Sequence, residues 1–294
     1  MQWESFLLFC VYFQLTYLPV DTETLQLYAQ FLSRSFKSVS SIRNYISGIR
    51  TVHQLLGYGL DNINSFILNL TLKGIQRLNP HCVKQAAPIT PMILSQIYGV
   101  LDFSCPDDVV YWCLFVFAFF LLARKSNLVP TSKKDIKMNR CLFRKNVHIS
   151  GENLVVCMNW SKTIQFGERK LWTPLLNLGD SILCPVKAFQ NLCKRVQHEQ
   201  DDPLFILKDK STITYNSFHK KLKFCIEKIG LNPKNFSSHS FRRGFATFAF
   251  NENISSDQIQ LLGDWKSDAY KNYISSSVED KLDILRSVKP KLLY

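Results

Sequence analysis

The chain has 294 residues, of which 46% are hydrophobic, and this suits one large or two medium domains and excludes a chain that is disordered throughout. Its net charge of +13 favours a polyanionic partner such as nucleic acid. The nine cysteines form no CxxC pair and no tight cluster with histidine, so we expect reduced thiols rather than a disulfide framework or a zinc site.

Two apolar stretches bear on the cellular location. The run at residues 109–123 is shorter than the roughly 20 residues that span a membrane, so we expect a buried core helix and no membrane partner. The run at residues 6–13 lacks the basic region and the cleavage site of a signal peptide. Basic pairs such as that at residues 133–134 are compatible with nuclear import, and we expect an intracellular, nuclear protein.

The first eighty residues carry helical periodicity. Apolar side chains recur at helical spacing, as at Leu25, Tyr28 and Leu32. The pattern predicts an all-α bundle of helices at residues 3–17, 22–33, 41–56 and 65–79. Each exposed basic residue of this bundle is individually explained as solvated surface, but as a group we expect these residues to contact DNA phosphates: Arg43, Arg50, Lys73 and Arg77.

Residues 81–89 read as a linker, which places a domain boundary near residue 86. We therefore expect a helical DNA-binding domain at residues 1–86 and a second domain at residues 87–294. Pro91 at a first helical turn opens the second domain. The predicted helices lie at residues 91–101, 107–123, 185–197 and 215–229.

Short β signals interrupt these helices. They lie at residues 141–143, 147–149, 154–160 and 170–175. A polar hairpin loop at residues 161–168 carries Lys162, and Arg124 follows the most apolar helix. The predicted fold is therefore mainly α with a small antiparallel β-sheet.

The stretch from Ser238 to Tyr273 carries the chemistry. His239 and Arg242 are three residues apart and share one face of a helix, and Tyr270 and Tyr273 follow. Arginine matches phosphate oxygens, histidine moves protons near neutral pH, and tyrosine can be a covalent nucleophile. This combination suggests attack on a phosphodiester, although an isolated HxxR pattern is weak by itself.

Four segments, taken in order, carry a family resemblance. They are ARKSNLVP at 123–130, SKTIQFGERKLWTPL at 161–175, SHSFRRGFAT at 238–247 and LLGDWKSDAYKNYI at 261–274. Together they resemble tyrosine recombinases of the phage-integrase family, and more closely the eukaryotic transposon-encoded Crypton or DIRS-like members. The resemblance implies an N-terminal SAM-like core-binding bundle and a mixed α/β catalytic domain.

The resemblance also implies a reaction. The family cleaves DNA through a 3′-phosphotyrosine intermediate without metal, ATP or another cofactor. By this likeness Arg124 and Arg242 hold the phosphate oxygens, Lys162 protonates the leaving oxygen, His239 handles a proton at the attacking side, and Tyr273 is the nucleophile. Donors placed where charge develops are worth roughly 3–4 kcal/mol each.

One position departs from the family. The residue nine before the tyrosine, usually a His or Trp that donates to the phosphate, is Asp264, which cannot donate when ionised. Either Trp265 takes that role after a one-residue shift, or Asp264 caps the next helix. Tyr270 is the rival nucleophile, although the spacing from Gly263 favours Tyr273.

The implied partners are double-stranded DNA and further copies of the chain, as a dimer on one site and a tetramer in synapsis. The last segment, residues 275–294, either docks on its own domain or is lent to a neighbouring protomer. Two alternative functions stay open, namely a catalytically inactive, domesticated DNA-binding protein and type IB topoisomerase-like relaxation. The chain can also be a fragment of a larger transposon protein.

Overall fold

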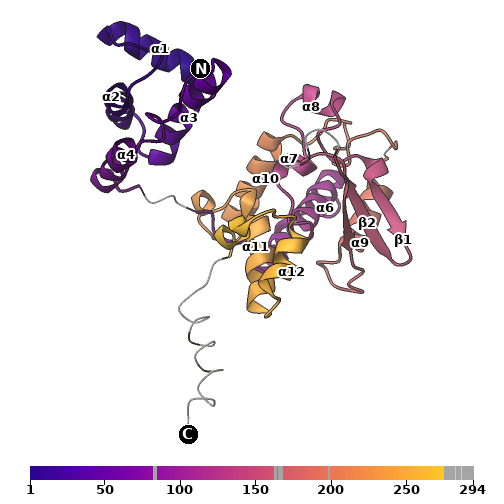
Figure 1. Ribbon diagram of the computed structural model, residues 1–294. Helices are drawn as coiled ribbons and strands as arrows, with labels where there is room; N and C mark the ends of the chain where they lie inside the picture. The colour runs from indigo at the N-terminus through magenta and orange to yellow at the C-terminus, as the bar shows by residue number, and fades with distance from the viewer. Residues whose placement is uncertain are drawn as a thin grey trace. The chain divides into compact units, whose positions relative to one another are not determined.

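The structure is a computed structural model that describes residues 1–81, 85–161, 164, 168–197, 199–274, 282 and 286. The chain divides into two compact units, residues 1–84 and 85–294, which are coloured from indigo to yellow in Figure 1 and are considered separately below.

The N-terminal unit is helical in its described residues. Its helices are α1 (Gln2–Phe13), α2 (Thr22–Ser33), α3 (Val39–Leu55) and α4 (Phe66–Leu78). Helices α1 and α2 pack against α3, and α2 also packs against α4. The Phe6 and Tyr28 rings meet in the centre of this core, with centroids 5.1 Å apart. Helix α1 ends earlier than its periodicity predicts, because Gln14 adopts a left-handed conformation (φ 52°) and terminates the helix.

The C-terminal unit combines helices with one small sheet. In chain order its elements are α5 (Pro91–Val100), α6 (Pro106–Phe120), α7 (Lys125–Leu128), α8 (Lys133–Lys137), η1 (Arg144–Asn146), β1 (Val147–Ser150), β2 (Asn153–Met158), β3 (Leu171–Leu175), α9 (Pro185–Arg195), α10 (Tyr215–Lys228), η2 (Pro233–Asn235), α11 (His239–Asn251), α12 (Ser256–Leu262) and η3 (Asp268–Asn272). The predicted fold class, mainly α with a small antiparallel sheet, is confirmed.

The sheet has the order β1–β2–β3 in the described residues, and both pairings are antiparallel. Val156 of β2 lies opposite Val147 on one side and Thr173 on the other. The prediction of a strand at residues 141–143 is wrong. The single turn of η1 separates this segment from β1, and Phe143 forms only an isolated bridge with Pro203.

Helix α6 is the centre of the C-terminal unit and lies between α9 and α11 (Figure 1). Every residue from 109 to 119 is buried, as the apolar run predicts. Phe115 packs against Phe218 of α10 and Phe241 of α11, with ring centroids 5.8 and 5.3 Å away. This packing places the end of α6 beside the start of α11, the two places where the sequence predicts catalytic arginines. None of the helices in the described parts of the chain is long and apolar enough to cross a membrane.

Gly244 permits a close approach between α11 and the segment that leads into α5. A Cβ atom at this position would lie 1.8 Å from the Ile89 carbonyl oxygen, and the Ile89 N–H donates to the Ser240 carbonyl at 2.9 Å. We expect Gly244→Ala to lower the free energy of unfolding by about 3 kcal/mol or more, because two hydrogen-bonded backbones cannot separate cheaply. Thermal or urea unfolding measures this loss.

The matched control is Gly99→Ala in α5, where a Cβ atom meets no other atom within 4 Å. Alanine is the better helix former, so this variant should be neutral or gain about 0.5–1 kcal/mol. Equal stability of the two variants would contradict the assigned role of Gly244.

Candidate active site

The Arg242 guanidinium lies at the centre of the candidate site. Its side chain is only 3% exposed. Nη1 donates to the Leu122 carbonyl just after α6, and Nη2 donates to the Gly263 carbonyl just after α12, at 2.8 Å. Nε is buried and has no partner among the described residues. Arg242 therefore ties the ends of two helices together, and its Nε–H donor stays unused.

Arg124 is a second cation at this place. It caps α7 and is half-buried, following Leu122, which adopts a left-handed conformation (φ 45°) at the end of α6. Burial, and then repulsion by Arg124, lower the pKa of Arg242 to about 9. The Arg242 guanidinium is therefore still protonated at neutral pH. Two adjacent cations with little water around them form a strong site for an anion.

Tyr273 follows η3 and is half-buried beside these groups. Its ring centroid lies 5.2 Å from Arg242 Cζ and 6.4 Å from the His239 ring. Arg243 Nη1 donates to the Asn272 carbonyl, so α11 also holds the backbone next to this tyrosine. The rival, Tyr270, is 3% exposed and lies within a hydrophobic cluster. Of the two tyrosines, Tyr273 is thus the one beside the arginine site.

Trp265 stacks on the Arg242 guanidinium and also packs against the Tyr273 ring. Its indole lies 3.9 Å from Arg242 Cζ, and its buried Nε1 has no partner within the described ranges. Gly263 makes room for it, since a Cβ atom there would lie 1.7 Å from an atom of the indole ring. The residue stacked on Arg242 therefore supplies a second buried donor without a partner among the described residues.

Asp264 turns toward a different partner. It adopts a left-handed conformation (φ 50°) just after α12, and its N–H donates to the Leu261 carbonyl while the next N–H donates to the Gln260 carbonyl. Such a helix end requires a left-handed residue at this position. The carboxylate pairs with Arg169, whose Nη2 lies 2.7 and 2.6 Å from its two oxygens. The alternative that Asp264 caps the next helix is wrong, because Ser267 takes that position before η3.

His239 begins α11 and is exposed to solvent. Desolvation by the surrounding groups, and then repulsion by cations such as Lys125 and Arg242, lower the pKa of His239 below its ordinary value of 6.5. The imidazole is therefore neutral at pH 7 and able to accept a proton.

We expect this shift to make the protein less stable in mild acid. Because the pKa of His239 is lower in the folded state, the unfolded chain binds the proton more readily. The contribution of neutral His239 to the free energy of unfolding is fully present above about pH 6.5 and is lost as the pH falls through the folded pKa. The drop in melting temperature between about pH 7.5 and about pH 5 should be smaller in His239→Gln than in the wild type. An unchanged drop would contradict the assignment, and His148→Gln, which changes an exposed histidine on β1, serves as the control outside the site.

Two predicted features lie outside the described residues. Lys162 is one of them, and next to it the structure places Ser161 and Ile164 in an isolated bridge beyond β2. The other is the segment at residues 275–294, of which only Leu282 and Arg286 are described.

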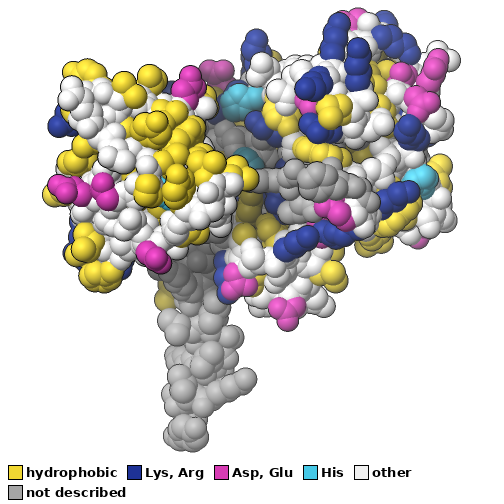
Figure 2. Space-filling model, turned by 45° about the horizontal axis from the view of Figure 1, so that its top comes forward, with side chains coloured by type: hydrophobic (Ala, Val, Ile, Leu, Met, Phe, Trp, Pro, Cys, Tyr) yellow, Lys and Arg dark blue, Asp and Glu magenta, His cyan; other side chains and the backbone are white. Residues whose placement is uncertain are grey.

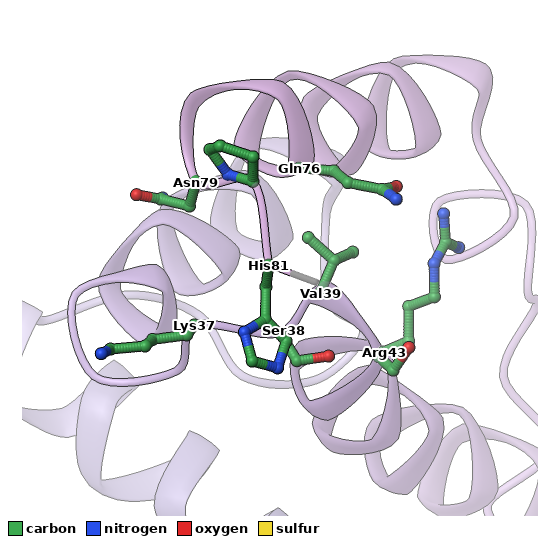
Figure 3. Close-up of a pocket in the computed structure, with 9 residues that line it drawn as sticks. Lys37, Ser38, Val39, Arg43, Gln76, Asn79 and His81 are labelled. Atoms are coloured by element: carbon green, nitrogen blue, oxygen red, sulfur yellow. The ribbon is translucent and has the colours of Figure 1, made fainter. Parts of the chain in front are cut away.

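The predicted DNA-contacting residues of the N-terminal unit, Arg43, Arg50, Lys73 and Arg77, are all exposed. Arg43 and Arg50 lie two turns apart on α3, and both donate to asparagines, Asn69 on α4 and Asn64 just before it. Arg43 also borders a cavity of about 460 Å³ between the start of α3 and the end of α4. Figure 3 shows the Arg43 and Gln76 side chains ending on the same side of this cavity, and the other residues that line it are Lys37, Ser38, Val39, Ser40, Asn79, Pro80 and His81. Lys73 and Arg77 do not line it.

The surface charge differs between the two units. In the view of Figure 2, lysine and arginine side chains gather on the C-terminal unit and hydrophobic ones on the N-terminal unit. Within the described residues, no group of three or more His, Cys, Asp and Glu side chains could hold a metal ion.

Sequence reasoning missed two contributors to the site, Arg169 and Arg243. Arg169 lies 95 residues from its partner Asp264, and no sequence period links them. The sequence did contain a signal for Arg243, namely a second arginine directly after Arg242. Consecutive residues of a helix point about 100° apart, so this second guanidinium reaches a different neighbour.

Comparisons with known proteins agree with this geometry. The model of the phage integrase family matches residues 92–279. Three solved structures share the fold at 13–14% identity. One is the XerH site-specific recombinase bound to a palindromic difH substrate, with a TM-score of 0.60 over 92% of this chain and 70% of that one. Another is the Tn1549 transposon integrase with circular intermediate DNA, with a TM-score of 0.55 over 92% of this chain and 86% of that one. The third is a lambda integrase dimer bound to a core site, with a TM-score of 0.53 over 87% of this chain and 65% of that one. No curated protein matches the chain significantly.

Proposed function

This chain belongs to the phage integrase family of tyrosine recombinases, and from that premise we propose that it cleaves and rejoins DNA strands through a 3′-phosphotyrosine intermediate. The observation that carries the proposal is the contact between the Arg242 guanidinium and the Tyr273 ring, whose centroid lies 5.2 Å from Cζ, with Arg124 and His239 close by. A nucleophile beside paired phosphate-binding cations is what this reaction requires.

The first step follows from these positions. The scissile phosphate enters between Arg124 and Arg242, which stabilise the charge that grows on its non-bridging oxygens. The Tyr273 phenol oxygen attacks phosphorus and gives its proton to the neutral His239. The bond from phosphorus to the 5′-oxygen breaks, and that oxygen takes a proton from Lys162, the role implied by the resemblance. A free 5′-hydroxyl from a second strand then reverses the step.

Trp265 takes the third phosphate contact in this proposal. Its unpaired Nε1 and the unpaired Nε of Arg242 are buried donors without acceptors among the described residues. A buried donor left unpaired costs about 1–3 kcal/mol, and a phosphate oxygen relieves that cost. No step of this scheme uses a metal ion or a nucleotide cofactor, since the bond energy is kept in the phosphotyrosine.

The partners follow from charge and from the relatives. The net charge of +13 suits double-stranded DNA, and the XerH, Tn1549 and lambda proteins are described as DNA complexes. We place the chain on DNA as a dimer on one site and a tetramer in synapsis. Arg43, Arg50, Lys73 and Arg77 then contact phosphates from the N-terminal unit. The transposon origin of the Crypton or DIRS-like kind, and action in the nucleus, belong to the same proposal.

The test is direct capture of the intermediate. Duplexes enriched from a random pool by binding to the protein are rebuilt as nicked suicide substrates, in which the released short strand diffuses away. Wild-type protein should form an SDS-stable adduct, and mass spectrometry of the linked peptide should identify Tyr273. Tight binding of the enriched duplex without any adduct would turn the proposal into that of a non-catalytic DNA-binding protein.

A further inference from the structure

Asp264 places a negative charge next to a site built for an anion. Its side chain is 18% exposed, and it directly precedes Trp265, which stacks on Arg242. The carboxylate lies within electrostatic reach of that guanidinium, since Asp264 is among the groups that raise the pKa of Arg242 against the larger effect of burial. An uncompensated carboxylate here would both repel a phosphate and compete with it for Arg242.

Arg169 compensates this charge. It lies two residues before β3, and its Nη2 bridges both carboxylate oxygens of Asp264, at 2.7 and 2.6 Å. Both partners are partly shielded, with side-chain exposures of 38% and 18%, so water weakens the attraction less than at an open surface. Meanwhile the buried Nε of Arg242 has no acceptor among the described residues. Arg242 thus retains a free donor that a released carboxylate could take.

We propose that Arg169 is a positioning residue of the active site, which holds the Asp264 carboxylate away from Arg242 and neutralises it, so that Arg242 is available for the scissile phosphate. The inference rests on the proposed function. It also explains how the site accepts an aspartate where the family usually has a hydrogen-bond donor. The carboxylate is turned to Arg169, and Trp265 occupies the place beside Arg242.

A double-mutant cycle tests this role. Arg169→Ala should lower the rate of adduct formation about 10²-fold, the size of effect seen when one oxyanion donor is lost. Asp264→Asn is a matched change, because asparagine has the same size and tolerates the left-handed backbone. By itself it should leave the rate within about threefold of wild type, and added to Arg169→Ala it should restore the rate to within about threefold. Arg169→Lys, which keeps the charge, should be close to wild type.

The opposite pattern would overturn the proposal. If the pair were only a strut between the start of β3 and the end of α12, Asp264→Asn would be as damaging as Arg169→Ala, and the double variant no better. Melting temperatures of all variants show that they are folded. Should Arg169→Ala fail to fold, Arg169→Gln, which keeps the aliphatic stem without the charge, takes its place in the cycle.

A second measurement separates this inference from the proposed function. If the wild type forms no adduct on a tightly bound suicide substrate, the proposed function fails, and a crystal structure of the Arg169 variant decides the inference alone. The expected result is an Asp264 carboxylate bonded to the Arg242 guanidinium. A carboxylate that still faces away from Arg242 would refute it.

Discussion

Tyr273→Phe should abolish the covalent protein–DNA adduct and lower strand cleavage by at least about 10⁴-fold, the scale expected for loss of a nucleophile. The change removes only the phenol oxygen, the atom that forms the bond to phosphorus in the proposed reaction. The ring contacts with Trp265 and Arg242, at 5.4 and 5.2 Å, are kept. Duplex binding and the melting temperature should therefore stay close to wild type. Adduct formation on the suicide substrate, measured beside binding by mobility shift, checks both expectations.

Tyr270→Phe is the matched control for this variant. Tyr270 lies one turn earlier and is buried in the hydrophobic cluster with Trp265 and Ile259, so removal of its hydroxyl should leave cleavage within about threefold. If Tyr270→Phe lost cleavage and Tyr273→Phe kept it, Tyr270 would be the nucleophile. Loss of cleavage in both variants would indicate a shared packing defect instead, which the melting temperatures would reveal.

Arg242→Gln should combine a large catalytic loss with a large loss of stability. In the proposed reaction the guanidinium stabilises the transition state, and removal of one such donor costs about 10²–10³-fold in rate. The guanidinium also donates to the carbonyls of Leu122 and Gly263. In the variant these two interior carbonyls lose their charged donor. We expect a decrease of about 3 kcal/mol in the free energy of unfolding from these two bonds. Urea unfolding and single-turnover cleavage, both at a temperature where the variant is folded, measure the two effects.

Arg124→Gln separates the two roles of Arg242. Arg124 is half-buried, and its change should lower the cleavage rate by a similar factor with a much smaller effect on stability. If Arg242→Gln were unstable yet cleaved DNA at the wild-type rate, Arg242 would be a structural tie between α6, α11 and α12 and not part of the chemistry.

Local patterns accounted for most of the architecture. The apolar run at residues 109–123 predicts a buried helix, and α6 is buried throughout its centre, because such a sequence has no polar face to offer to water. The valine-rich run before Lys162 predicts β2, because β-branched side chains fit the pleated surface of a sheet. Where the predictions erred, as at residues 141–143 and at the end of α1, a single turn or one left-handed residue decided the boundary. Such local choices carry little periodic signal.

The sequence by itself determined the family and the face shared by His239 and Arg242, because helical spacing and motif order are properties of the chain alone. Only the tertiary structure decided the positions of the Asp264 and Trp265 side chains. The indole reaches Arg242 because Gly263 has no side chain, and the carboxylate turns away because Arg169 arrives from the start of β3. Contacts between residues far apart in the chain depend on how helices and strands pack. A close approach or an ion pair of this kind produces no periodic pattern in the sequence.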